Sequence, residues 1–578
     1  MINLTINGIP VQANEGENIL EAAKTVGIII PSLCYINLHN VDLVCKTGSC
    51  RVCLVEVEGR RNLAPACSTL VSEGMSVKTD TARVTKARRT VVELLLSNHP
   101  SDCLVCKRSH HCELQQLAAS MGIRGLKYKA DIPTGIKDIS NYSIERNPEK
   151  CILCRRCETV CNEVQKIGVY SAIDRSYDTK LDTSFHRPMI EGICTFCGQC
   201  VAVCPTAALT EVDNGRVVFK ELQNSKKYCV AQTAPAVRVA LGEEFGIPNG
   251  TDVTGKMVAA LRRLGFDKVF DTDFAADLTI MEEGTELINR LNNGGTLPMM
   301  TSCCPAWVKF LEHRYPEMIP NLSSCKSPHE MLGAVLKHHY APTHVPTEQE
   351  IVTVSIMPCL AKKYEANRPE MAEDGVRDVD YVLSTRELAR MIREAGLDFA
   401  NLPDEDFDST LGESTGAAVI FGVTGGVMEA ALRTAYEVLT KEKLEKLEFH
   451  AVRGFKGIKE AEVDINGTKV AVAIAHGLGN ARQLMELIKS GAKQYHFIEV
   501  MACPGGCIGG GGQPYHHGDM ELIQARANAI YGADEAKVIR RSHENVELME
   551  FYRSFLGEPN SEVAHHLLHT HYHQRNRL

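Results

Sequence analysis

The sequence predicts a multidomain protein in which small α+β domains precede one large α/β domain. Its length of 578 residues allows about four domains, and an apolar content of 44% is enough for large cores. Most of the 23 cysteines lie in spaced blocks before residue 219. From about residue 219 strand-like runs alternate with amphipathic helices, which is typical of a mostly parallel sheet. We therefore expect domains at 1–80, 81–135, 136–218 and 219–578.

The composition argues against several classes of protein. The net charge is -9, and no basic stripe suggests a nucleic-acid surface. No run of about eighteen apolar residues and no signal-peptide pattern is present. Cysteines at repeated C-x-x-C spacing in such a chain indicate metal ligands rather than disulfides. We expect a cytoplasmic protein that binds neither membrane nor nucleic acid, in a reducing cell.

The first block follows a predicted hairpin, Leu4 to Val11, with an Asn7-Gly8 turn. A helix near 19–26 and a strand at 54–57 follow. The block resembles the plant-type 2Fe-2S ferredoxins, which are β-grasp domains with four cysteine ligands. Cys45 completes a literal C-x4-C-x2-C, whereas Pro31-Ser-Leu-Cys34 resembles the first ligand of that family. We choose one 2Fe-2S site made of Cys34, Cys50, Cys53 and Cys67, with Cys45 as the alternative first ligand.

The second block combines one histidine with three cysteines. It comprises His99, Cys103, Cys106 and Cys112. From residue types alone, zinc and iron are about equally compatible with this set. The spacing His-x3-Cys-x2-Cys-x5-Cys resembles the His-ligated 4Fe-4S cluster of hydrogenases and of respiratory complex I, which implies a 4Fe-4S cluster here.

The third block repeats one spacing twice. Cys151-x2-Cys154-x2-Cys157-x3-Cys161 recurs as Cys194-x2-Cys197-x2-Cys200-x3-Cys204-Pro205. This is the bacterial two-cluster ferredoxin pattern, in which the fourth cysteine of each run binds the other cluster. One 4Fe-4S cluster is therefore expected on Cys151, Cys154, Cys157 and Cys204, and another on Cys194, Cys197, Cys200 and Cys161.

Four accessory clusters indicate one-electron transfer along the chain. No G-x-G-x-x-G lies between a strand and a helix, and the glycine run 509–512 lacks the Lys-Ser/Thr of a phosphate loop. We therefore expect no nicotinamide, flavin or nucleotide. The electron partner should be another protein, such as a ferredoxin or flavodoxin-type carrier, or a further subunit.

Three segments of the large domain place cysteines at predicted element ends. They are Thr301-Ser-Cys-Cys-Pro-Ala-Trp307, Met357-Pro-Cys-Leu-Ala-Lys-Lys363 and Met501-Ala-Cys-Pro-Gly-Gly-Cys507. A helix with Met257, Val258, Leu261 and Leu264 on one face and a strand at 351–356 lie between the blocks. The three segments resemble the signature motifs of the iron-only (FeFe) hydrogenases, and the resemblance extends over nearly the whole chain.

The resemblance implies the H-cluster. Cys304, Cys359, Cys503 and Cys507 would hold its 4Fe-4S part, and the Cys507 thiolate would bridge to a two-iron centre with carbonyl, cyanide and dithiolate ligands. Dedicated maturation proteins install that centre in the family. By the same resemblance, Lys362 and Pro235 would contact cyanide, while Met357 and Met501 would line the pocket. Cys303 is spare beside a ligand.

Protons must cross a buried core, and a thiol with an ordinary pKa near 8.5 exchanges them at modest cost. Cys303 is the natural inner end of a relay. Glu283, Glu286 and Arg290 lie at i, i+3 and i+7 on one predicted helix face. Periodicity alone favours a solvated face with an ordinary Glu286–Arg290 ion pair. The family resemblance instead implies a proton path through Glu283, Ser323, Glu286 and Arg290.

Three functions fit these observations. The first is ferredoxin hydrogenase, which catalyses H2 oxidation and proton reduction. The second is the hydrogen-activating subunit of an NAD(P)-linked or electron-bifurcating complex. The third is a hydrogen sensor or an iron-sulfur assembly protein, which the intact motifs disfavour. Cys229 and Cys325 are expected to be buried structural thiols, and the histidine-rich tail 565–573 is expected to lack a fixed geometry.

Overall fold

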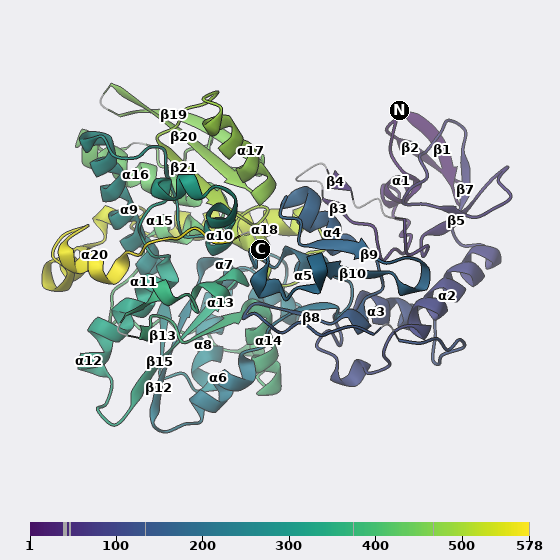
Figure 1. Ribbon diagram of the computed structural model, residues 1–578, viewed down its shortest axis with the longest axis horizontal. Coiled ribbons are helices and arrows are strands. Elements are labelled where there is room, and N and C mark those ends of the chain that lie inside the picture. The colour runs from purple at the N-terminus through teal and green to yellow at the C-terminus, as the bar shows by residue number, and fades with distance from the viewer. Residues whose placement is uncertain are drawn as a thin grey trace.

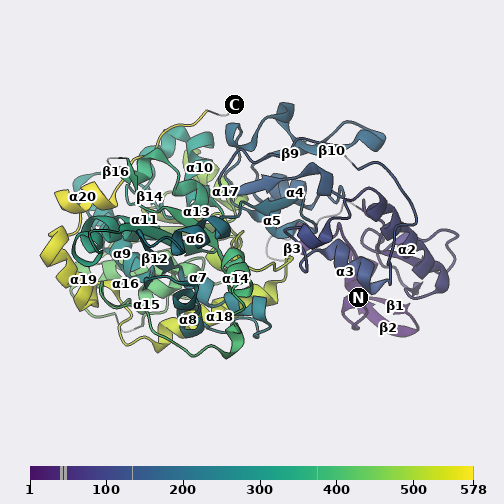
Figure 2. The same cartoon turned by 90° about the horizontal axis from the view of Figure 1, so that it is seen from below.

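The computed structural model describes residues 1–38, 43–44, 48–132, 134–373, 375–444, 446–465 and 467–576. Figure 1 shows a small N-terminal part at one end of the molecule, a slender middle part, and a large body that holds the rest of the chain. The turned view in Figure 2 gives the same sequence of parts. No helix among the described residues is long and apolar enough to span a bilayer.

The N-terminal part is a five-stranded sheet packed on one short helix. The predicted hairpin is confirmed, because β1 (Ile2–Ile6) pairs antiparallel with β2 (Ile9–Ala13) around Asn7 and Gly8, both at positive φ. The sheet order is β2-β1-β7-β5-β6, with β7 at Ser76–Lys78, β5 at Leu54–Val57 and β6 at Ala64–Pro65. Helix α1 (Ile19–Lys24) ends earlier than expected, because Gly27 turns the chain at a φ of 75°.

Two helices link this sheet to the middle part. Helix α2 (Ala82–Ser97) begins at Thr81, whose side chain accepts a hydrogen bond from the backbone N–H of Val84. Helix α3 is Glu113–Ser120. The middle part has two antiparallel strand pairs, β8 (Ile144–Arg146) with β11 (Leu209–Glu211) and β9 (Tyr170–Ile173) with β10 (Lys180–Thr183). Two short helices, α4 (Arg156–Thr159) and α5 (Gln199–Val203), carry cysteines.

The large body contains two four-stranded sheets where the sequence suggested one. The first, in order β13-β12-β15-β18, is entirely parallel. Its strands are Lys268–Asp271, Lys227–Thr233, Glu350–Met357 and Tyr381–Ser384. The second, in order β14-β21-β20-β19, has one antiparallel edge strand. Its strands are Met299–Met300, Phe497–Met501, Thr468–His476 and Ile458–Ile465.

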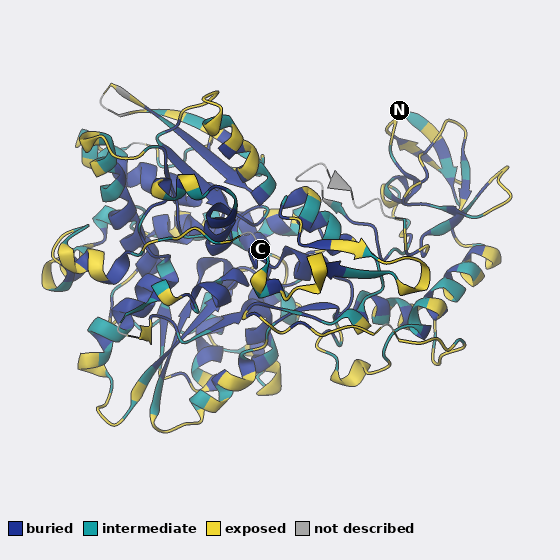
Figure 3. Cartoon of the chain, in the orientation of Figure 1, coloured by how far each residue is buried: buried dark blue, intermediate teal, exposed yellow. Residues whose placement is uncertain are grey.

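Helices cover and separate the two sheets, and the strand interiors are buried (Figure 3). The predicted helix around Met257 is α8 (Thr254–Leu264), and its apolar positions are buried as expected. The helices nearest the site are α9 (Asp273–Asn293), α10 (Pro305–Arg314), α11 (Pro328–Val335) and α13 (Ala361–Glu365). Further helices include α16 (Gly426–Thr440), α18 (Met520–Ala536), α19 (Val546–Phe551) and α20 (Glu562–Leu568).

The histidine-rich tail has a defined structure, so the expectation that it lacks one was wrong. Helix α20 is followed by an extended stretch in which His569 forms an antiparallel bridge with Cys325. His569 is 5% exposed. Buried Ala564, Leu567 and Leu568 anchor the helix in a core cluster that includes Phe274 and Met331. The prediction considered only the histidines of this segment and did not use the helical spacing of its apolar residues.

Candidate metal and catalytic centre

The central cavity of the large body lies where strands of both sheets end. Pro235 follows β12, Met357 ends β15 and Met501 ends β21, and all three line this cavity. The carboxyl ends of parallel strands are where α/β proteins gather functional groups. Both sheets therefore contribute to the walls of the cavity, whose volume is about 90 Å³.

Five cysteines face this cavity, and all five belong to the three signature segments. They are Cys303, Cys304, Cys359, Cys503 and Cys507. Cys304 is the N-cap of α10, and its Sγ accepts a hydrogen bond from the Ala502 N–H at 3.4 Å. Burial, with the neighbouring Cys304, raises the pKa of Cys359 to about 12. Thiolates packed at such a site need metal ions to balance them, so the donor set fits a cysteine-ligated iron-sulfur cluster.

A buried polar network occupies one wall of the cavity. Lys362 Nζ donates to the Cys303 carbonyl at 3.0 Å and to Glu365 Oε2 at 2.7 Å. His329 Nε2 lies 2.8 Å from the same carboxylate oxygen. Against the opposing effect of burial, Lys362 and His329 hold the pKa of Glu365 at about 2. A positive group is therefore fixed at a cavity whose other lining is mainly apolar.

Glu283 lies on α9 and is 1% exposed. Neither of its carboxylate oxygens has a hydrogen-bond partner among the described residues. Burial, and then the nearby Glu286 charge, raise the pKa of Glu283 to about 8. The Glu283 carboxylate also raises the pKa of Cys303, although burial is the larger cause. A carboxyl group that is neutral at pH 7 and close to a cavity thiol is suited to hold and release a proton.

Glu286 lies one helical turn from Glu283 on α9 and is partly exposed. It accepts from Ser323 Oγ at 2.8 Å and from Arg290 Nη2 at 2.6 Å. Arg290 also donates to the carbonyl of Leu322 at 2.7 Å. The side chains of Glu286 and Arg290 are 13% and 16% exposed. The structure thus brings all five predicted relay residues into one region, and it also contains the simple ion pair that periodicity predicts.

The eight cysteines of the middle part form two groups. Burial, and then the neighbouring Cys204 and Cys151 thiolates, raise the pKa of Cys154. Burial, and then the Cys194 and Cys161 thiolates, raise the pKa of Cys197. Cys157 belongs with the first group and Cys200 with the second. The fourth cysteine of each run therefore lies with the other run, as the spacing predicts.

The second of these groups adjoins the central cavity. A Cβ added at Gly198 would lie 2.8 Å from Leu360 Cδ1, and one added at Gly511 would lie 2.7 Å from the Cys197 carbonyl oxygen. Burial is the largest cause of the raised pKa of Cys503, and the nearby Cys197 thiolate adds to it. Glycines at these two positions let the middle part and the cavity loops approach closely.

The His99 block is the most exposed of the cysteine groups. Cys103 is exposed, Cys106 is partly exposed and Cys112 is buried. Burial and the neighbouring Lys150 lower the pKa of His99 to about 4, and its Nδ1 is buried without a partner among the described residues. A neutral imidazole with a free nitrogen is the form that binds a metal ion, so this set fits a metal cluster.

In the N-terminal part, the thiols of Cys34, Cys50, Cys53 and Cys67 interact with one another, and all four are buried. The alternative ligand Cys45 lies outside the described residues. Elsewhere, Cys229 and Cys325 are buried, as expected.

Sequence reasoning missed two side chains of this centre. Glu365 follows Lys362 at i+3 on α13, and that spacing could have indicated the pair. His569 is close to Cys325 and Glu286 only because the chain folds back, since 244 residues separate it from Cys325. No local pattern could have placed it there.

Comparison with known proteins agrees with this geometry. Residues 227–511 match the family model of the iron only hydrogenase large subunit, C-terminal domain, and 520–575 match the iron hydrogenase small subunit. Residues 1–82 match a 2Fe-2S iron-sulfur cluster binding domain. Residues 88–126 match the NADH-ubiquinone oxidoreductase-G iron-sulfur binding region, and 150–208 match a 4Fe-4S dicluster domain.

Similar proteins cover the whole chain. The NADP-reducing hydrogenase subunit HndD of Solidesulfovibrio fructosivorans is 56% identical over 100% of both chains. Iron hydrogenase 1 of Clostridium pasteurianum is 41% identical over 99% of this chain and 100% of its own. A solved FeFe-hydrogenase structure from Chlamydomonas reinhardtii, 42% identical, covers 63% of this chain and 100% of its own with a TM-score of 0.57. The chain therefore belongs to the iron-only hydrogenase family.

Proposed function

We propose that the central cavity is where this iron hydrogenase interconverts H2 with two protons and two electrons. The observation that carries the proposal is the convergence of five cysteines and Lys362, which Glu365 holds in place, on one cavity. Four of the thiolates, Cys304, Cys359, Cys503 and Cys507, would hold the H-cluster, with Cys507 as the bridging ligand. The cluster, when bound, supplies the metal site at which H2 is split or formed.

The chain's own residues orient that cofactor and exclude water. The Lys362 ammonium is held by Glu365 and the Cys303 carbonyl, so it is positioned to donate toward an anionic ligand such as cyanide. Pro235, Met357 and Met501 close the apolar walls. Such walls keep the dielectric low and strengthen the interaction of a fixed cation with an anionic ligand.

Proton movement is assigned to five side chains. Cys303 would exchange a proton with the reacting site, and Glu283 would take it from the thiol. The Ser323 hydroxyl already donates to Glu286, and Glu286 pairs with Arg290 near the surface. The raised pKa of Glu283 supports this order, because a carboxyl group with a pKa of about 8 both accepts and releases protons near neutral pH.

Electrons would pass through one 2Fe-2S and three accessory 4Fe-4S clusters. The predicted cysteines and His99 would be the ligands, and a β-grasp domain would surround the 2Fe-2S site. For the His99 block, the match to an iron-sulfur binding region favours iron over zinc. The close approach of the Cys197 loop to the cavity supports that group as the last step of the electron path.

The electron partner would be a ferredoxin or flavodoxin-type carrier, and maturation proteins would supply the two-iron centre. A second candidate is the hydrogen-activating subunit of an NADP-linked complex. The observation favouring it is the 56% identity, over the full length of both chains, to an NADP-reducing hydrogenase subunit. We place either form in the cytoplasm.

An infrared spectrum of anaerobically matured protein, recorded together with H2 production from reduced viologen, tests the activity. Carbonyl and cyanide bands with turnover are expected. Bands without turnover would indicate a sensor, and neither signal after verified maturation would overturn the proposal. Purification of untagged protein from its host separates the two candidates, since a stable complex that reduces NADP with H2 supports the second.

A further inference from the structure

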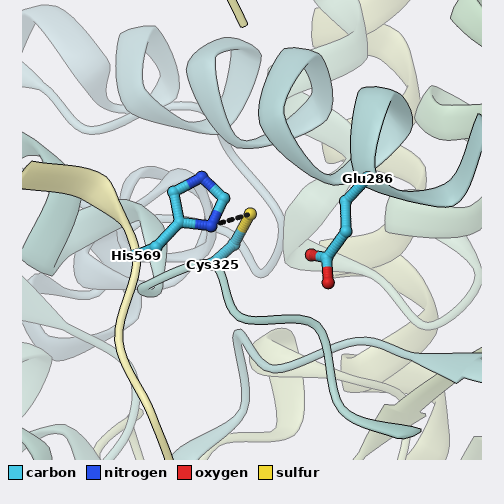
Figure 4. Close-up of side chains that lie close together, drawn as sticks. All are labelled: Glu286, Cys325 and His569. Carbon is cyan, nitrogen blue, oxygen red and sulfur yellow. Dashed lines mark hydrogen bonds between the residues drawn. The ribbon is translucent and has the colours of Figure 1, made fainter. Parts of the chain in front are cut away.

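The inner relay meets a second titratable group at Glu286. Figure 4 shows Glu286 on α9 facing a pair formed by Cys325 and His569 from the C-terminal tail. One carboxylate oxygen of Glu286, the Cys325 Sγ and a His569 ring nitrogen all lie within 4.8 Å of one another. His569 Nδ1 is 4.0 Å from Cys325 Sγ. The proposed proton path does not use this histidine.

Backbone bonds fix His569 at this place. The Thr570 N–H donates to the Ser324 carbonyl at 2.7 Å, and the Lys326 N–H donates to the Leu568 carbonyl at 2.8 Å. Ser324 touches both side chains in question. Its N–H donates to Glu286 Oε2 at 3.1 Å, and its Oγ lies 2.8 Å from His569 Nδ1. Only a short gap therefore separates the Glu286 carboxylate from the imidazole.

The other side of the ring faces a buried carboxylate. His569 Nε2 lies 3.0 Å from Glu282 Oε2, and Glu282 is fully buried. Glu282 also accepts from the Tyr552 hydroxyl at 2.5 Å and from the Asn560 N–H at 2.8 Å. These bonds fix the tautomer with a proton on Nε2 and leave the Nδ1 lone pair toward Glu286 and Ser324. The ring therefore lies between the buried Glu282 carboxylate on one side and the Glu286 end of the relay on the other.

Two groups with access to solvent lie against the buried imidazole, the partly exposed Ser324 at Nδ1 and the exposed His565 over the ring face. The ring of His565, an exposed residue of α20, stacks on His569 with centroids 4.5 Å apart and an interplanar angle of 7°. The titratable groups that lie beside His569 are thus Glu282 and Glu286 from α9, Cys325, and His565 from α20. Tyr552, which follows α19, contacts Glu282 through its hydroxyl, which donates to that carboxylate.

We propose that His569 is a second outlet of the proton relay, parallel to Arg290. The Glu286 O–H proton passes to Ser324 Oγ while the hydroxyl's own proton forms an N–H bond at His569 Nδ1, so one bond breaks for each bond that forms. The Glu282 carboxylate balances the imidazolium charge. The Nδ1 proton returns to the partly exposed Ser324 hydroxyl while that hydroxyl gives its proton to water, which restores the neutral ring. Uptake of protons from solvent follows the same bonds in reverse. This inference rests on the proposed hydrogenase function.

The substitution His569→Gln is designed to remove proton transfer at this position while keeping its hydrogen bonds. The glutamine amide keeps a donor for Glu282 and an acceptor for Ser324, but it does not carry a proton at neutral pH. Since one of two parallel outlets is lost, we expect H2 production at low buffer concentration to fall about two- to fivefold. The exchange of H2 with D2O, which needs proton movement but no net electron flow, should slow by a similar factor. Infrared bands of the active centre and the unfolding midpoint should not change.

Two further variants complete the test. His569→Ala should lose at least as much exchange and regain part of it on addition of imidazole. His566→Gln is the matched control, because His566 lies on the same helix, its side chain is 70% exposed and it pairs with Glu373 at 2.7 Å. It should behave as wild type with or without imidazole.

A readout independent of turnover uses protein without the two-iron centre. After transfer into D2O, the protonated carboxyl band of Glu286, assigned with Glu286→Gln, should exchange its proton more slowly in His569→Gln than in wild type, because one path for that proton is lost. Wild-type H2 exchange, no imidazole effect and an unchanged rate of the carboxyl exchange would overturn the inference. If matured wild-type protein itself showed neither infrared bands nor H2, the proposed function would fail instead.

Discussion

At the scale of single residues, adjacent cysteines are given different tasks. Cys304 caps α10 and accepts a backbone hydrogen bond through sulfur. Cys303 contributes its carbonyl to Lys362 and its side chain to the cavity lining. The Cys303 thiol is therefore available for the proposed proton exchange, while Cys304 would bind the cluster.

This division predicts opposite outcomes for two substitutions. Cys303→Ala should keep every cluster and lose turnover by about 10²-fold or more, the range of a lost general acid-base group. Cys304→Ala should lose the active cluster itself. Infrared spectra, iron content and H2 production on the same samples distinguish the two. Cys229→Ala is the control, since that thiol is buried away from every cluster group, and wild-type turnover in loaded Cys303→Ala would refute the relay role.

The raised pKa of Glu283 predicts that the stability of the protein depends on pH. The pKa of this carboxyl is raised from 4.5 to about 8 in the folded protein, so the folded state binds more protons than the unfolded state between these values. Stability from this group is therefore greatest below pH 4.5 and falls by about 1.4 kcal/mol per pH unit until the folded pKa is reached. Glu283→Gln should remove that slope.

The measurement is the unfolding midpoint at pH 5 and pH 8 under anaerobic conditions. The difference between the two midpoints should be smaller in Glu283→Gln than in wild type. Glu462→Gln, at a side chain that is 55% exposed, should leave the difference unchanged. Equal differences in all three proteins would show that Glu283 ionises as an ordinary carboxyl group.

At the scale of elements, strand ends and one helix position the centre. The signature cysteines follow β14, β15 and β21, and α9 supplies Glu282, Glu283, Glu286 and Arg290 on neighbouring faces. Helical spacing alone predicted the Glu286–Arg290 pair, and turn chemistry predicted the β1–β2 hairpin. The division into two sheets could not be read from the sequence, because strand order depends on contacts between distant segments. The same reason hid the Cys325–His569 bridge.

Close packing between the middle part and the cavity loops gives a prediction at this scale. A methyl group on Gly511 would lie 2.7 Å from the Cys197 carbonyl oxygen and the Gly198 backbone. Gly511→Ala should therefore cost about 1–3 kcal/mol of stability, as overpacking does, and should lower the unfolding midpoint. A Cβ at Gly125 meets nothing within 4 Å, so Gly125→Ala is the control. An unchanged midpoint in Gly511→Ala would mean that the loops separate at little cost.

At the scale of the whole molecule, the cysteine groups run from the N-terminal end through the middle part to the large body (Figure 1). Spacing alone assigned the crossed fourth ligands, since the repeat states which cysteines belong together. Spacing could not choose between Cys34 and Cys45, or between zinc and iron at His99. The first choice depends on how a loop folds. The second depends on the chemistry of the bound group, and there the match to an iron-sulfur binding region favours iron.

The order of the groups predicts which reactions need the electron path. The Cys197 loop contacts Leu360 and Gly511 at the cavity, so Cys197→Ser should interrupt electron flow to every external carrier. H2 production from reduced viologen should fall about tenfold or more, because iron-sulfur clusters carry the electrons one at a time. Exchange of H2 with D2O should persist, since it needs only the active centre and the proton relay. Cys50→Ser, at the far end, should lower turnover with a protein carrier and spare turnover with viologen. Loss of exchange in Cys197→Ser, with the infrared bands intact, would show that this group supports the active centre itself and is more than a conduit for electrons.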